Sequence, residues 1–99
     1  MQVKCFLAVV TATCVLNADV FAASPEPPPA AMACSGCHPA TASVQTPVPR
    51  LQGRNATEII EQMQAFRDGK REATVMGRIA KGFSDPEIQA IAVWYAQLN

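Results

Sequence analysis

The sequence has a single histidine, His38, and no net charge, because its eight lysines and arginines balance eight aspartates and glutamates. A neutral chain argues against binding to nucleic acid, which favours basic proteins. The lone histidine excludes any site that needs two imidazoles from one chain. No run of alternating apolar residues predicts a β-strand, and no apolar stretch after the first 22 residues is long enough for a transmembrane helix. These absences favour a small all-α protein.

Residues 1–22 have the features of a secretory signal peptide. Lys4 gives a positively charged start, the apolar run 6–16 is too short to span a bilayer, and residues 20–22 offer small side chains before a cut. We therefore expect a periplasmic mature protein without a transmembrane segment. An uncleaved membrane anchor is the alternative interpretation, but polar residues end the apolar run early.

Cleavage would remove two of the four cysteines and leave Cys34 and Cys37. In the remaining chain, residues 23–30 are expected to form a proline-rich N-terminal arm with an extended backbone. Residues 31–99 are expected to form one domain. A domain of this size has a marginal hydrophobic core, so a bound group is expected to help stabilise it.

Three helices are predicted in this domain, and each has a sequence signal at its start or its end. Pro39 stops the first helix, and Asn55 caps the second. Ser84 and Glu87 form a capping box for the third. The predicted spans are about 30–38, 56–68 and 85–98. The two segments between the helices lack helical periodicity and are predicted to be long loops that pack on a bound group.

Cys34-Ser35-Gly36-Cys37-His38 reads C-x-x-C-H, which is the attachment signature of c-type haem. Two thiols at this spacing bond to the vinyl groups of the porphyrin, and the adjacent histidine can bind the iron. We assign Cys34 and Cys37 to covalent attachment of one haem and His38 to the proximal iron ligand. A zinc site is one alternative, but the motif supplies only three ligands. A thioredoxin-like redox pair is another, but it expects a βαβ context that is absent.

The sixth iron ligand must come from a residue other than histidine. Met32 lies too close to the attachment motif to reach the opposite haem face, and Met63 falls on the apolar face of the second predicted helix, where it is expected in the core. Met76 is far enough from His38 for the chain to pass around the haem. We predict Met76 as the distal ligand, which would favour the reduced iron. The alternatives are a lysine, an open site, or Met76 as a packing residue of its loop.

Further residues are expected to support the haem. The carbonyl of Pro49 is expected to accept a hydrogen bond from the second ring nitrogen of His38, which would fix the orientation of the ring. Five cations surround Met76 in the sequence, namely Arg67, Lys70, Arg71, Arg78 and Lys81. They form either a docking rim for an acidic partner or a solvated loop with a contact to a haem propionate, and the two interpretations can coexist.

The chain resembles the class I cytochromes c in four features: Cys34-Ser35-Gly36-Cys37-His38, Pro49-Arg50-Leu51-Gln52-Gly53, Met76, and a C-terminal helix with Trp94. The resemblance implies a small all-α fold with three or more helices and long loops around one covalent haem with His/Met ligation. Residues 65–71 and 73–85 are similar to the cytochrome subunits of flavocytochrome c sulfide dehydrogenases. That similarity implies a one-electron carrier, not an enzyme by itself, which accepts electrons from a flavoprotein subunit or another redox protein.

Two other functions stay open at this point. The chain could be a free soluble monohaem shuttle of the c5 or c-553 type that serves an oxidase or a reductase. It could also be a haem sensor or haem enzyme with an open distal site, which requires that Met76 does not bind iron. Rapid binding of carbon monoxide by the reduced protein would favour the last of these functions.

Overall fold

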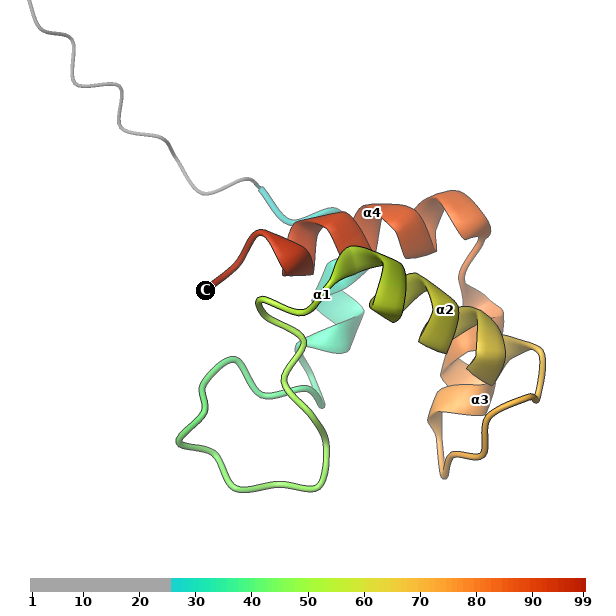
Figure 1. Ribbon diagram of the computed structural model, residues 1–99, viewed down its shortest axis with the longest axis horizontal. Coiled ribbons are helices and arrows are strands. Elements are labelled where there is room, and N and C mark those ends of the chain that lie inside the picture. The colour runs from blue at the N-terminus through green and yellow to red at the C-terminus, as the bar shows by residue number, and fades with distance from the viewer. Residues whose placement is uncertain (1–25) are drawn as a thin grey trace, which may run out of the picture.

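The computed structural model describes residues 26–99, and every regular element in that range is helical. The elements follow in the order α1 (Ala31–Cys34), α2 (Ala56–Arg67), α3 (Met76–Ile79), the 3₁₀ helix η1 (Ala80–Gly82) and α4 (Asp85–Ala96) (Figure 1). The predicted all-α fold is confirmed. The predicted signal peptide and the first part of the proline-rich arm lie outside the described residues.

The start of α2 follows from its N-cap. The side-chain oxygen of Asn55 accepts hydrogen bonds from the backbone N–H groups of Thr57 (2.9 Å) and Glu58 (3.3 Å), which would otherwise lack partners in the first turn. The helix ends one residue before the predicted limit. Gly69 follows it with a φ of 72°, a left-handed conformation that glycine adopts without the strain of a Cβ atom.

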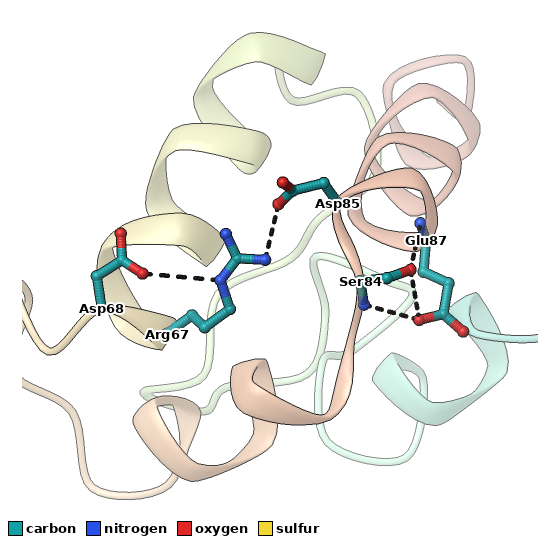
Figure 2. A network of polar contacts seen from close by, with 5 residues as sticks. All are labelled: Arg67, Asp68, Ser84, Asp85 and Glu87. Carbon is teal, nitrogen blue, oxygen red and sulfur yellow. Dashed lines mark hydrogen bonds and ion pairs between the residues drawn. The ribbon is translucent and has the colours of Figure 1, made fainter.

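The start of α4 is a capping box, as predicted. The backbone N–H of Ser84 donates to the Glu87 carboxylate (2.8 Å), and the backbone N–H of Glu87 donates to the Ser84 hydroxyl (3.4 Å) (Figure 2). The helix ends at Ala96, two residues before the predicted limit. Gln97 and Leu98 form a turn there, in which their N–H groups donate to the carbonyls of Trp94 and Tyr95.

The core lies where α4 crosses α2 and α1. The buried residues of α4 fall at helical spacing on one face, namely Ile88, Ile91, Ala92 and Tyr95. Helix α2 contributes Ile59 and Met63 to the same cluster. The Tyr95 hydroxyl donates to the Ala31 carbonyl at 3.2 Å and so joins α4 to α1 inside the protein. The ring of Trp94 is half-buried and stands edge-on to the Tyr95 ring, with 4.7 Å between the ring centroids.

Two predictions about local structure were wrong. The first helix was expected to run to His38, but α1 ends at Cys34 and is followed by a turn in which the N–H groups of Cys37 and His38 both donate to the Cys34 carbonyl. Met76 was placed in a loop, but it is the first residue of α3. This helix is too short to leave a periodic signal. It is stabilised by packing against α2, and Ala80 of the following 3₁₀ helix is completely buried.

Candidate functional site

A cavity of about 390 Å³ lies between α1, the loop that follows it, α2 and α3. In Figure 1, α1 and its loop lie to the left and α3 to the right, beneath α2 and α4. Most of the side chains that line the cavity are apolar. The four residues assigned to the haem all line it, namely Cys34, Cys37, His38 and Met76. The fold therefore brings together two sequence segments that are 38 or more positions apart.

The two cysteines stand at the end of α1 and in the turn after it. Both thiols are free; Cys34 is half-buried and Cys37 is exposed. Burial raises the pKa of the Cys34 thiol, so this side chain stays protonated at neutral pH. Because Tyr95 binds the Ala31 carbonyl one turn before Cys34, the position of the first thiol is fixed by a contact in the core.

The orientation of the His38 ring is set by a backbone carbonyl of the loop that follows α1. Nδ1 of His38 lies 2.6 Å from the carbonyl oxygen of Pro49. A carbonyl can only accept, so Nδ1 carries the proton and donates it. The imidazole is then the tautomer whose Nε2 lone pair is available to a metal ion, and the acceptor increases the basicity of that nitrogen.

The four methionines differ in how they relate to the cavity. Met76 is half-buried and lines it, whereas Met32 is 59% exposed and does not. Met63 is 7% exposed and belongs to the core, but it also lines the cavity, which sequence reasoning did not foresee. Neither of the lysines in the described part of the chain, Lys70 and Lys81, lines the cavity. The fourth methionine, Met1, lies outside the described residues.

Two apolar side chains on either side of Met76 in the sequence show what kind of group fits the cavity. Val75 is 55% exposed and Ile79 is 41% exposed, yet both line the cavity and face its other apolar walls. Exposed apolar surface inside a concave site is the mark of a binding site for an apolar ligand. A haem presents a flat apolar ring of this kind, so the cavity, its apolar walls and the donor set of one imidazole, one thioether and two thiols fit it.

The five predicted cations differ in their contacts. Arg67 pairs with Asp85 (Nη1 to Oδ1, 2.7 Å) and with Asp68 (Nε to Oδ1, 3.7 Å), which together raise the pKa of its guanidinium (Figure 2). Arg71 lies over the ring of Phe66, 5.0 Å from its centroid, and lines the cavity. The other three cations are exposed and lie outside the cavity lining, namely Lys70, Arg78 and Lys81.

Sequence reasoning missed Arg54 as a residue of the site. Its side chain lines the cavity and donates to Glu58 at 2.6 Å. Arg54 lies two residues before the first residue of α2, so the spacing rule for helical neighbours did not predict this contact. Within residues 26–99, no group of three or more His, Cys, Asp or Glu side chains is arranged to hold a metal ion. The same range contains no helix of the length and hydrophobicity that a bilayer span requires.

Comparison with known proteins shows which family the chain belongs to. The chain is 36% identical over 67 residues to cytochrome c-554(548) of Halomonas halodenitrificans, and the match covers 64% of this chain and 81% of that protein. It is 34% identical over 68 residues to the cytochrome subunit of sulfide dehydrogenase of Chlorobaculum tepidum, covering 69% of this chain and 62% of the relative. It is 42% identical over 70 residues to a thiosulfate dehydrogenase electron acceptor of Stutzerimonas stutzeri, covering 67% of this chain and 32% of the relative. No family model matches the chain.

The described residues form a small all-α fold with a mostly apolar cavity. With these relatives, the chain belongs to the class I cytochromes c. Membership of this family implies haem c binding and the general role of an electron carrier. The chain spans less than two thirds of the length of the sulfide dehydrogenase subunit and about a third of the thiosulfate dehydrogenase electron acceptor.

Proposed function

We propose that the protein is a periplasmic one-electron carrier with one haem, bonded covalently through Cys34 and Cys37 and ligated by His38 and Met76. The observation that carries this proposal is the cavity, which all four residues line from two separate segments of the chain. When bound, haem supplies an iron that takes up and releases a single electron. The protein itself makes and breaks no substrate bonds in this function.

Each residue has a defined task in this proposal. The two free thiols lie at the edge of the cavity, where they can form thioether bonds. His38 presents Nε2 because its other ring nitrogen is bound to Pro49 at 2.6 Å. A thioether from Met76 raises the reduction potential relative to a second imidazole. The apolar walls exclude water, which also favours the form of the iron with less charge.

We further propose that the protein is the electron-accepting haem subunit of a sulfide-oxidising flavocytochrome. This assignment is supported by the similarity to the sulfide dehydrogenase subunit of Chlorobaculum tepidum. A free soluble shuttle of the c5 or c-553 type is the second candidate. It is supported by the cytochrome c-554(548) relative, of which the chain covers 81%.

The cations beside α3 suggest how a partner would bind. Lys70, Arg71, Arg78 and Lys81 are exposed and lie in or next to the segment that carries Met76. We propose that these four residues, which we call the distal basic surface, attract an acidic redox partner. Arg67 does not belong to it, because two carboxylates of the same chain neutralise its charge.

Spectroscopy of the purified full chain, expressed with a haem-attachment system, tests the first proposal. We expect one thioether-bonded haem per chain by the pyridine haemochrome assay, a thioether-to-iron charge-transfer band in the oxidised protein, and slow binding of carbon monoxide to the reduced protein. A chain that binds carbon monoxide rapidly and lacks the band has an open distal site, which would make the sensor or enzyme interpretation correct.

The partner and the location need separate measurements. Mixing the oxidised protein with a sulfide-reduced flavoprotein should give fast reduction and a stable complex if the protein is a flavocytochrome subunit. Fast reduction without a stable complex favours the free shuttle, and the absence of any reduction overturns the flavocytochrome assignment. The mass of the protein recovered from the periplasm should correspond to cleavage near residue 22; recovery of the uncleaved chain from membranes would overturn the location.

A further inference from the structure

Met76 lies on a segment whose two ends meet at one ion pair. This segment, residues 68–84, leaves the C-terminus of α2 and returns to the N-terminus of α4. Arg67 is the last residue of α2 and Asp85 is the first residue of α4. Nη1 of Arg67 lies 2.7 Å from Oδ1 of Asp85, although the two residues are 18 positions apart (Figure 2). The pair therefore closes the base of the segment that presents Met76.

Helix α2 also packs on α3, η1 and α4, so the ion pair adds a polar contact between the last residue of α2 and the first residue of α4 to this packing. The N–H groups of Lys70 and Arg71 both donate to the Ala65 carbonyl, which fixes only the departure from α2. Ala80 is completely buried against the core, and the cap of α4 involves only residues of α4 and its N-cap. Residues 71–75, immediately before Met76, are all exposed. The part of the segment that leads to Met76 is thus held less firmly than the part that follows it.

We propose that Arg67 and Asp85 are positioning residues that hold the Met76 segment closed and so slow the release of the thioether from the haem iron. The proposal rests on the proposed function, in which Met76 is the distal ligand. Release of the thioether requires the segment to move away from the cavity, and such movement is resisted by any contact that joins α2 to α4 at its base. Neither residue would touch the haem, so each would act through the position of Met76.

The expected size of the effect follows from the exposure of the pair. The side chain of Arg67 is 27% exposed and that of Asp85 is 63% exposed, so water and salt screen the interaction. Exposed ion pairs measured by double-mutant cycles change an equilibrium constant by up to about fivefold. We therefore expect thioether release to become about two- to fivefold faster when the pair is broken.

The experiment measures capture of imidazole by the oxidised holoprotein. At saturating imidazole the observed rate equals the rate at which the Met76 sulfur leaves the iron. Arg67→Ala and Asp85→Asn should each give the expected increase, and the double variant should give no more than either single one, because both changes remove the same contact. In about 1 M salt, where the Debye length is near 3 Å, the wild-type rate should approach that of the variants.

Glu87→Gln is the matched control. Glu87 is a carboxylate of the same first turn of α4, but its hydrogen bonds go to Ser84 and none goes to α2 (Figure 2). Its loss should lower the stability of α4 and leave the imidazole rate at the wild-type value. The charge-transfer band of every variant confirms that the haem site is intact before the rate is compared.

The outcomes separate this proposal from the one on which it rests. A wild-type protein with no thioether band contradicts the ligand assignment, and the positioning role falls with it. A wild-type protein with the band, but with the rates of Arg67→Ala and Asp85→Asn equal to that of Glu87→Gln, overturns the positioning role alone. Additive increases in the double variant also overturn it, because two residues that act through one shared contact cannot give additive effects.

Discussion

The hydrogen bond from Tyr95 to the Ala31 carbonyl links the core to the helix that carries the first haem-attachment cysteine. Tyr95 is 1% exposed and Ala31 is 1% exposed, so the bond is shielded from water. Replacing Tyr95 with phenylalanine keeps the ring and removes only the hydroxyl group. The carbonyl then loses its side-chain partner in a place that water does not reach.

The expected cost comes from two contributions. A hydrogen bond of this kind contributes about 0.5–1.5 kcal/mol net, and a buried acceptor left without a partner costs about 1–3 kcal/mol. Since the variant can relax slightly around the missing atom, we expect a loss of about 1–2 kcal/mol in the free energy of unfolding. In a domain of this size each kcal/mol lowers the melting temperature by about 4–8 °C.

Denaturant unfolding of the holoprotein, followed by circular dichroism, measures this loss. Ser35→Ala is the control, because it removes a hydroxyl-to-carbonyl bond to the same helix (2.8 Å, to Met32) at an exposed position. Its effect should stay within about 0.5 kcal/mol. An unchanged or increased stability of Tyr95→Phe, or equal losses in both variants, would show that the buried bond does not stabilise α1.

Three further predictions concern the core, the pH dependence and the partner surface. Ile91→Ala should lower the free energy of unfolding, measured with denaturant, by about 2–5 kcal/mol, because Ile91 is 1% exposed and also lines the cavity. A loss below about 1 kcal/mol would contradict this packing. Burial raises the pKa of Tyr95 from 10.0 to about 12, so the folded state holds this proton more tightly and its stability should fall as pH rises from about 10 to 12. The loss of stability that comes from the titration of Tyr95 should be absent in Tyr95→Phe. Identical pH profiles of the two proteins would refute this prediction. Replacing Lys70 and Lys81 with glutamate should slow electron acceptance from the flavoprotein and weaken its salt dependence. The control Gln89→Glu, at an exposed position on α4, should change neither. Equal effects would exclude the distal basic surface as the binding site of the partner.

The long helices were predictable because their signals are local. Asn55 and the Ser84–Glu87 pair satisfy backbone donors within three residues of themselves, so the sequence alone indicates where each helix begins. The buried face of α4 was predictable for the same reason, since its spacing follows the helical repeat. The helix ends were less accurate, because the last turn depends on which carbonyls find partners in the loop that follows.

The short elements were not predictable from local signals. Helix α3 has four residues, one of which is a glycine, and it exists because Met76 and its neighbours pack on α2 across the sequence. Helix α1 also has only four residues and passes into a turn in which the Cys34 carbonyl accepts from the N–H groups of Cys37 and His38. The formation of α3 depends on tertiary contacts, which override weak propensities in a segment this short.

The candidate site was predictable where it rests on one motif and less so where it rests on distance. The C-x-x-C-H motif places two thiols and the imidazole together by covalent connection alone. Met63 lines the same cavity as Met76, and Asp85 neutralises the charge of Arg67. Both contacts result from the way α2 packs on the chain that follows it. No spacing in the sequence reports such contacts.

The identity of the distal ligand is the claim on which the account most depends, and the cavity offers a matched pair of variants to test it. Met76 and Met63 both line the cavity, so Met76→Leu and Met63→Leu each remove one sulfur atom from the same site and keep a similar side-chain volume. The measurement is the thioether-to-iron charge-transfer band of the oxidised protein. The band should disappear in Met76→Leu and persist in Met63→Leu, with the haem still bonded through Cys34 and Cys37 in both. A band that persists in Met76→Leu and disappears in Met63→Leu would contradict the assignment of Met76 as the distal ligand.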